Sequence, residues 1–321
     1  MAKLTKAQAK QHAAAVAILA KDGPLTADEK EFVARNWNEA ADHLNTIAGA
    51  HFTPFDLAMD TALDVGGDRL LDLCAGIGIL GLAAVFRGKV REQDLVCIEI
   101  NPAYVAVGKR LLPEATWITA DAFAFPSLNL GRFDCIMSNP PFGKSATKTG
   151  SGPRYTGPDF DLALLDLAAD HADWLIFIMP QGNCGFQYSG RHYYERPKTG
   201  KGPAFEAQTG LYMECGIGID TSLFRNDWKT VSVTCEIVTV DVANCPAFTP
   251  ARVDASAPAV EPLSLANGIF DQLLMPGVAP IQPLRRELDA LVAKRAHKRG
   301  MAPMPAGGLF AAPAPLQQNL F

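Results

Sequence analysis

Short apolar runs and segments with helical spacing alternate along the middle of this chain. The apolar runs predict buried β-strands at 70–74, 94–99, 115–118, 133–137 and 174–179. Strands that alternate with helices are typical of a parallel sheet with crossover helices. Two further apolar runs, near 211–219 and 230–241, predict an antiparallel pair. The pattern therefore predicts an α/β fold whose sheet is mostly parallel and ends in an antiparallel strand.

The pattern changes at both ends of this α/β region. Two helices are predicted before it, over 4–20 and from Thr26 to about Asn45, and the second opens with a capping box. After about 243 the chain is rich in Pro and Ala, with one basic amphipathic helix near 284–298. We therefore divide the chain into an N-terminal helical segment (1–48), an α/β domain (49–242) and a Pro/Ala-rich tail (243–321).

Composition narrows the class of protein. The net charge of −5 argues against a protein whose whole surface grips nucleic acid, so any such contact must come from local basic segments. The seven cysteines are scattered without a C-x-x-C pair, which indicates a reducing compartment and predicts no metal site. No apolar stretch approaches the length of a membrane span. We expect a cytoplasmic protein with no membrane partner.

The most informative stretch is Ser138–Gly143, with the sequence SNPPFG, directly after the apolar run 133–137. The carboxyl ends of parallel strands are where ligands bind in open α/β sheets. Residues before proline are pushed to extended geometry, so Asn-Pro-Pro forms a stiff arch. The arch offers the Asn139 side-chain oxygen, the Pro140 carbonyl and the face of Phe142. Two acceptors and an aromatic plane suit an amino group on a flat ring, such as a nucleobase amine.

Three other predicted strand ends carry polar or glycine residues. The first strand runs into a turn from Asp72 to Gly78, in which missing side chains let a ligand approach the backbone. Glu99 ends the second strand, where an acidic side chain can accept both hydroxyls of a ribose. Asp121 ends the third, placed to bind an adenine amino group. Each signal is common alone, but their order is specific.

This order resembles the class I S-adenosylmethionine-dependent methyltransferases of the amino-methylating branch, over about 49–241. The resemblance implies a Rossmann-like, seven-stranded, mostly parallel sheet with an antiparallel last strand. It implies that the methionine part of the cofactor lies against Asp72, Ala75, Gly76 and Gly78, the ribose on Glu99, and the adenine on Asp121 and Ala122. Cys74 departs from the pattern, since the family more often has Phe or Gly there.

Within that branch the chain resembles the adenine-N6 DNA methyltransferases. Phe52-Thr53-Pro54 is similar to an element that these enzymes place beside the cofactor carboxylate, before the glycine turn. The resemblance implies that Asn139, Pro140, Pro141 and Phe142 are catalytic and that Asn139 also borders the cofactor. The base must be flipped out or single-stranded to reach such a site. Adenine N6 is favoured, while guanine N2 and adenine N6 in RNA stay open.

Residues 181–209 interrupt the alternation and are the predicted substrate-recognition insertion. They mix cations, which suit phosphates, with aromatic rings, which suit unstacked bases. The candidate nucleic-acid contacts here and beside the arch are Lys144, Lys148, Arg191, Tyr193, Tyr194, Arg196 and Lys198.

The last five residues, QQNLF, resemble the pentapeptide by which bacterial DNA-processing proteins bind the replication sliding clamp. Gln317, Leu320 and Phe321 match its strongest positions. The sequence therefore predicts an S-adenosylmethionine-dependent methyltransferase acting on adenine N6 of DNA. The alternatives are an RNA methyltransferase and an inactive nucleic-acid-binding protein.

Overall fold

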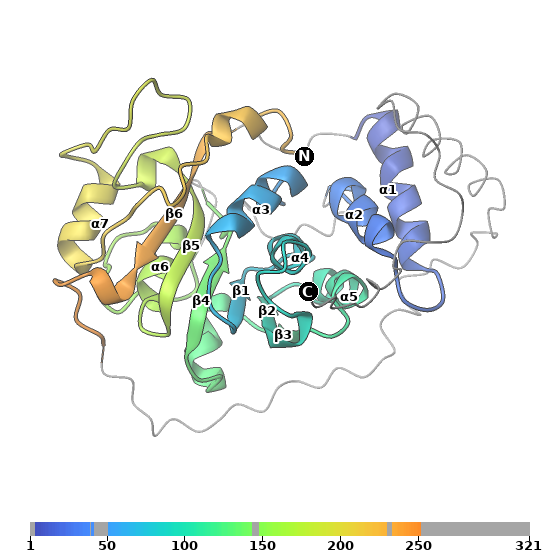
Figure 1. The fold of residues 1–321 in the computed structure, drawn as a ribbon, viewed down its shortest axis with the longest axis horizontal. Helices are drawn as coiled ribbons and strands as arrows, with labels where there is room; N and C mark the ends of the chain where they lie inside the picture. Colours follow the sequence, from blue (N-terminus) through green and yellow to red (C-terminus); the bar gives the residue numbers. More distant parts are fainter. Residues whose placement is uncertain (1–3, 39, 42–50, 143–147, 230–232, 252–321) are drawn as a thin grey trace, which may run out of the picture. The chain divides into compact units, whose positions relative to one another are not determined.

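The computed structural model describes residues 4–38, 40–41, 51–142, 148–229 and 233–251. Within these ranges one six-stranded sheet has the order β3-β2-β1-β4-β5-β6 (Figure 1). The first five strands are parallel, and β6 runs antiparallel to β5. Their bounds are β1 Leu70–Leu73, β2 Leu95–Glu99, β3 Thr116–Thr119, β4 Phe133–Ser138, β5 Ala172–Pro180 and β6 Cys235–Asp241. The predicted Rossmann-like α/β fold with an antiparallel last strand is confirmed.

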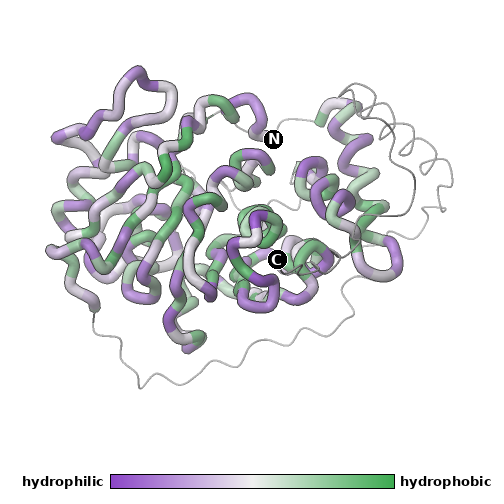
Figure 2. Tube along the Cα trace, in the orientation of Figure 1, coloured by the Kyte–Doolittle hydropathy of each residue, from purple (hydrophilic) through white to green (hydrophobic). Residues whose placement is uncertain are grey.

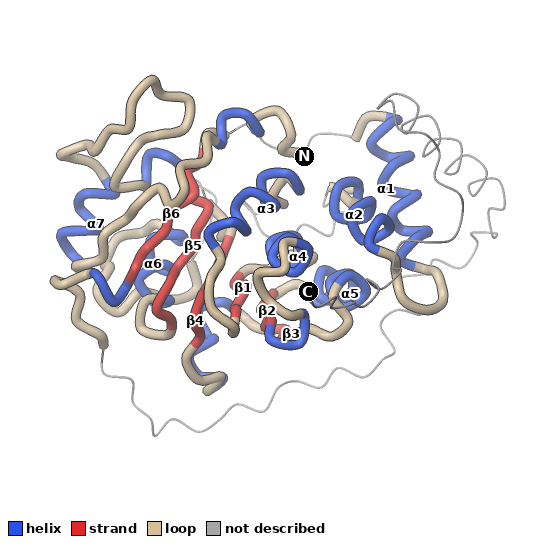
Figure 3. Tube along the Cα trace, viewed as in Figure 1, coloured by secondary structure: helices blue, strands red, loops and turns tan. Residues whose placement is uncertain are grey.

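Helices cover both faces of the sheet (Figure 3). The helices α3 (Phe55–Thr61), α4 (Ile79–Phe86) and α5 (Pro102–Leu111) share one hydrophobic core with alternate strand residues such as Leu70. The helices α6 (Phe160–Ala168) and α7 (Lys201–Thr209) share a second core with the intervening residues such as Leu71. The alternation follows from the two-residue period of a strand. The central strands are buried on both faces, which is why most of their residues are hydrophobic, and α4 is apolar along its whole length (Figure 2).

The N-terminal helices α1 (Lys6–Leu19) and α2 (Ala27–Asn36) pack on the α5 side of the sheet. Thr5 and Thr26 each close a capping box, as predicted for Thr26. Arg110 on α5 donates to the carbonyls of Leu19, Lys21 and Gly23 in the connection that follows α1. Helix α2 ends at Asn36 rather than near Asn45, and Trp37 there takes an extended conformation.

One prediction differs from the structure at the β6 edge of the sheet. The strand expected over 211–219 is reduced to an isolated antiparallel bridge between Glu214 and Thr239, so the described residues form six strands instead of seven. Gly210, Gly216 and Gly218 all have positive φ, which prevents a regular extended strand there. The insertion 181–209, in turn, contains a helix, α7.

The strand order creates a topological switch point between β1 and β4. From β1 the chain proceeds outward through β2 and β3, and then returns to the other side of β1 as β4. The connections after β1 and β4 therefore leave the sheet in opposite directions, which opens a crevice at their carboxyl ends. The glycine turn and the Asn-Pro-Pro-Phe arch meet at this crevice.

Candidate active site

Asn139 is held in a single orientation at the end of β4. Its Nδ2 donates to the His51 carbonyl and to Thr53 Oγ1, both at 2.9 Å. These bonds use both amide hydrogens and fix which atom is the oxygen. Oδ1 is buried and has no hydrogen-bond partner among the described residues. Because buried polar atoms are normally paired, this oxygen indicates a position for an external donor.

The rest of the arch is packed into the protein. Pro140, Pro141 and Phe142 are all buried. Only 7% of Phe142 is exposed, and its ring lies 5.8 Å from the His51 ring and edge-on to Trp228 at 6.3 Å. Pro141 and Asn139 line the neighbouring cavity, whereas Phe142 does not. The arch is thus anchored at Phe142 and open at Asn139.

The glycine turn brings the backbone after β1 against its neighbours. Gly76 and Gly78 have φ of 58° and 83°, and Gly78 begins α4. A Cβ on Gly76 would lie 2.9 Å from Cε1 of Phe52, so the ring of Phe52 rests on the turn. Cys74 also has a positive φ, 57°, which explains why Gly suits this position. Ala75 is buried in the same turn.

Glu99 and Asp121 extend this edge of the sheet. Glu99 accepts from the Gly76 and Asn101 backbone N–H groups, both at 2.8 Å, through different oxygens. A carboxylate has about four acceptor positions, so it retains capacity for a ligand. Asp121 Oδ1 accepts from the Phe123 N–H at 2.8 Å. Glu99, Asp121 and Ala122 all line the cavity.

Asp72 lies behind the turn rather than on the cavity wall. It is fully buried, and its Oδ2 accepts from the Gly81 N–H at 3.1 Å. Its Oδ1 has no partner among the described residues. Burial, with a smaller contribution from the Glu99 charge, raises the pKa of Asp72 to about 8. Burial also raises the pKa of Glu99 and, far above its usual value, that of the Cys74 thiol, which therefore stays protonated.

Glu99, Asp121 and Asn139 line a cavity of about 160 Å³. Its acceptors come from Glu99, Asp121 and Asn139, and its apolar walls come from residues that include Ile98, Ile100, Ala120, Ala122 and Phe160. A second cavity, lined by Thr53, Ala75 and Gly76 among others, shares His51, Phe52, Cys74 and Asn139 with it. Acceptors for hydroxyl and amino groups beside apolar walls fit a nucleoside-bearing cofactor.

Sequence reasoning missed four contributors to this edge. His51 and Tyr104 line the cavity, Phe160 forms part of its wall, and Trp37 packs behind it. Tyr104 follows the Asn101 cap on the first turn of α5, so its place at the strand end could have been inferred. Trp37 has no such signal, because its contacts are to residues far along the chain.

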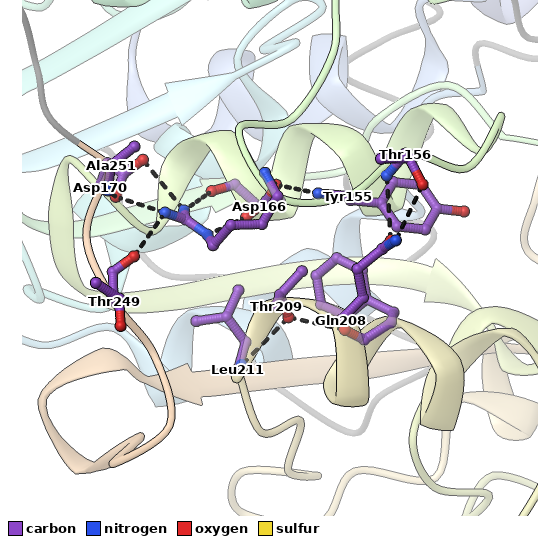
Figure 4. A network of polar contacts seen from close by, with 11 residues as sticks. Tyr155, Thr156, Asp166, Asp170, Gln208, Thr209, Leu211, Thr249 and Ala251 are labelled. Carbon is purple, nitrogen blue, oxygen red and sulfur yellow. Dashed lines mark hydrogen bonds and ion pairs between the residues drawn. The ribbon is translucent and has the colours of Figure 1, made fainter.

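Three basic residues near the arch and insertion are engaged within the protein. Arg196 donates to Glu206 Oε1 at 2.6 Å and to the Met213 carbonyl at 2.8 Å, and its guanidinium lies 3.9 Å from the Tyr212 ring centroid. Lys148 donates to the Gly157 carbonyl at 2.6 Å. Arg154 forms ion pairs with Asp166 on α6 and with Asp170 just after α6, and Figure 4 shows these two aspartates among their neighbours. These side chains stabilise loops.

The other insertion candidates are more exposed. Tyr193 is 80% exposed, and Tyr194, at 43%, stacks on Phe186 at 5.7 Å. Arg191 is exposed and donates to Gln187 Oε1 at 2.5 Å, and Lys198 is exposed as well. Lys144, Gln317, Leu320, Phe321 and the predicted helix at 284–298 lie outside the described residues.

Two predicted absences can be examined only where the structure describes the chain. There, no three His, Cys, Asp or Glu side chains are grouped so that they could hold a metal ion. None of the helices in these ranges is long and apolar enough to cross a membrane.

Comparisons with known proteins agree with this geometry. Residues 57–151, which run from α3 past the arch, match the family model of the methyltransferase small domain. No curated protein matches the chain.

Similar solved structures have low identity to the chain. A type I restriction-modification methyltransferase subunit from Streptococcus thermophilus has 14% identity and a TM-score of 0.45, covering 67% of this chain and 48% of that one. The Thermus thermophilus 16S rRNA N2 G1207 methyltransferase has 20% identity and a TM-score of 0.36, covering 59% and 43%. TrmN from Thermus thermophilus has 13% identity and a TM-score of 0.35, covering 70% and 51%. The chain thus spans about half the length of each.

The matched segment contains β1 to β4, and hence both the glycine turn and the arch that meet at the switch point. Residues 57–151 are thus similar to the methyltransferase small domain, and both the glycine turn and the arch fall within them.

Proposed function

We propose that this enzyme methylates the exocyclic N6 of adenine in DNA. The observation that carries the proposal is the buried Oδ1 of Asn139, which has no hydrogen-bond partner among the described residues and whose orientation is fixed by the His51 carbonyl and Thr53 Oγ1. An acceptor that is already aligned costs no reorganisation when the donor arrives. An amino group with two N–H donors is the substrate that suits this oxygen together with the carbonyl of Pro140.

The residues at the switch point fit S-adenosylmethionine. Glu99 has acceptor capacity for ribose hydroxyls, Asp121 and Ala122 border the apolar part of the cavity, and Gly76 keeps side chains off the turn. The cofactor supplies a methyl group on a positively charged sulfur, which leaves as a neutral thioether. Asp72, Ala75 and Gly78 shape the turn from behind, and Phe52 and Thr53 border it.

Asn139 is the side chain that binds the reacting amine of the substrate. The amine lone pair is shared with the ring, so the nitrogen is a poor nucleophile until its N–H groups are bound by Asn139 Oδ1 and the Pro140 carbonyl. With the amine held there, the bound cofactor would supply the methyl group to the nitrogen, and the proton lost from the nitrogen would pass to solvent. Most of the rate enhancement then comes from positioning and from acceptors facing the positive charge that develops on nitrogen. Pro141 stiffens the arch, and Phe142, which is buried and does not line the cavity, anchors it.

Exposed residues of the insertion are the proposed nucleic-acid contacts. Arg191, Tyr193 and Lys198 are exposed, so they can reach phosphates and unstacked bases. Tyr194 supports them through its stacking on Phe186. Arg196 and Lys148 keep the neighbouring loops in place, and Lys144 follows the arch in sequence.

The choice of DNA rests on the resemblance of residues 317–321 to a clamp-binding pentapeptide. We propose that Gln317, Leu320 and Phe321 bind the bacterial replication sliding clamp. Purified clamp should bind the intact chain and should not bind the chain lacking 317–321, while methylation of short oligonucleotides stays unchanged. An intact chain without measurable clamp affinity contradicts this role.

The substrate is tested by incubating the pure protein with isotope-labelled cofactor and separate pools of duplex DNA, single-stranded DNA and bulk RNA. Nucleoside mass spectrometry then identifies the labelled base. We expect N6-methyldeoxyadenosine with the wild type and none with Asn139→Ala. Label found only in RNA, as N6-methyladenosine or N2-methylguanosine, would show that the substrate is RNA and not DNA. Cofactor binding without label in any pool would indicate an inactive nucleic-acid-binding protein.

A further inference from the structure

A cluster of buried aromatic rings joins the N-terminal helices to the cofactor cavity. Trp37, just after α2, is 3% exposed and stacks on Phe52 at 5.6 Å with an interplanar angle of 29°. It also meets the ring of Tyr104 edge-on at 5.6 Å, and Phe52 and Tyr104 are 5.1 Å apart. Phe52 and Tyr104 both line the cavity. One side of the cavity wall is therefore supported by a residue that does not touch the cavity.

The contact continues from the Phe52 ring to the ligand-facing groups. Phe52 lies against Gly76 so closely that a Cβ there would be 2.9 Å from its ring. The Gly76 N–H in turn donates to Glu99 Oε2 at 2.8 Å. A shift of the Phe52 ring would thus release the glycine turn and reorient the Glu99 carboxylate. Trp37 stands at the start of this chain of contacts.

Lys229 contacts both Trp37 and Phe52. Its Nζ donates to the Trp37 carbonyl at 2.5 Å and to the Ala34 carbonyl at 3.3 Å, at the end of α2, where a cation is favourable. The same Nζ lies 6.0 Å from the Phe52 ring centroid, within cation–π range. The preceding residue, Trp228, packs edge-on against Phe142 of the arch. Residues 228 and 229 therefore connect the cofactor wall with the arch.

We propose that Trp37 and Lys229 are positioning residues that preorganise the cofactor wall, so that the N-terminal helices complete the cofactor site. Neither residue contacts the reacting atoms. Both act through Phe52, which fixes the glycine turn and Glu99. A cofactor wall that is already rigid raises the affinity for the cofactor, because less conformational entropy is lost when the cofactor binds. The inference concerns cofactor binding alone and holds whichever nucleic acid is methylated.

The test measures the Kd of S-adenosylhomocysteine by calorimetry on the full chain without nucleic acid. Trp37→Ala should weaken binding about tenfold, the scale of one well-packed aromatic contact that preorganises a site. Trp37→Phe keeps a stacking ring and should recover binding to within about threefold. Trp174→Ala is the matched control, because Trp174 lies near the start of β5, away from the carboxyl ends of the strands. It should lower Tm but leave Kd unchanged.

Lys229→Met keeps the proposal testable if Trp37→Ala does not fold. Methionine keeps an unbranched apolar stem but loses the charge and both hydrogen bonds. We expect the KM for S-adenosylmethionine to rise about fivefold while kcat at saturating cofactor changes less than twofold, the pattern of lost binding without lost chemistry. An unchanged Kd in Trp37→Ala, a change equal to that of Trp174→Ala, or an effect of Lys229→Met on kcat alone would overturn the proposal.

Discussion

The arch and the insertion differ in whether the protein itself satisfies the hydrogen-bonding groups of their polar side chains. At the arch, both hydrogens of the Asn139 amide are bound, but its buried oxygen has no partner among the described residues. In the insertion, the Arg196 guanidinium is bound by Glu206, the Met213 carbonyl and Tyr194, with Tyr212 against its face. A satisfied polar group stabilises the fold, whereas a buried unsatisfied one indicates a ligand. By this criterion Asn139 is a ligand-binding residue and Arg196 a stabilising one, although the sequence makes both of them candidate site residues.

The largest expected effect is that of Asn139→Ala. Removing the oriented acceptor should lower kcat by about 100- to 1000-fold, the usual cost of losing one preorganised hydrogen bond to developing charge. The Kd for S-adenosylhomocysteine should change less than twofold. Single-turnover methylation together with calorimetry checks both quantities.

Thr53 gives the matched control for this prediction. Thr53→Ser keeps the hydroxyl that accepts from Asn139 Nδ2 and should keep kcat, while Thr53→Val removes it and should lower kcat about tenfold because the amide is no longer held. Equal rates for the two variants would show that the orientation of Asn139 does not limit the reaction.

The next prediction contrasts Tyr193 with Arg196 in the insertion. Tyr193→Ala removes an 80% exposed ring and should raise the KM for nucleic acid by about 5- to 50-fold through lost base stacking, without a change in Tm. Arg196→Met should instead destabilise the fold by about 2 kcal/mol, because it leaves Glu206 and the Met213 carbonyl without their charged donor.

Thermal unfolding and steady-state kinetics on both variants test this contrast. Tyr193→Phe is the control, since it retains the stacking face and should behave as the wild type. A loss of Tm in Tyr193→Ala, or a large KM effect in a fully stable Arg196→Met, would reverse the roles assigned to them.

The smallest expected effect concerns Asp72, a buried carboxylate whose Oδ1 has no hydrogen-bond partner among the described residues. Its pKa of about 8 in the folded protein is far above the value of about 3.9 in an unfolded chain. Between these values the folded state binds a proton that the unfolded state has released, so the free energy of unfolding falls as pH rises toward 8. We expect a loss of at most about 1 kcal/mol per pH unit between pH 6 and 8 in the cofactor-free protein.

Urea unfolding at several pH values measures this slope. Asp72→Asn has no carboxyl to titrate and should have a flatter slope than the wild type over the same window. Asp161, whose pKa burial raises to about 6, contributes with the same sign mainly below that window. Identical slopes in the two proteins would mean that Asp72 is not the group responsible.

Much of the fold and the order of the site could be predicted from the sequence, because both depend on local patterns. Parallel strands bring their carboxyl ends to one edge, so the sequence alone predicts that the glycine turn, Glu99, Asp121 and Asn139 lie together. The end of α2 and the strand expected near 211–219 could not be predicted in the same way. Trp37 and the positive-φ glycines that decide them act through packing and backbone geometry.

By itself, the sequence determined an α/β methyltransferase sheet and which strand ends carry its polar residues, because periodicity and strand order are properties of the chain. Only the tertiary structure decided which of those polar atoms are already satisfied. Asn139 Oδ1 has no partner in the described part of the chain, and its orientation is fixed because Nδ2 is bound by residues 51 and 53, far away in sequence. Arg196 is satisfied because Glu206 and Tyr212 fold back onto it. Partners of this kind depend on long-range packing, which no local pattern encodes.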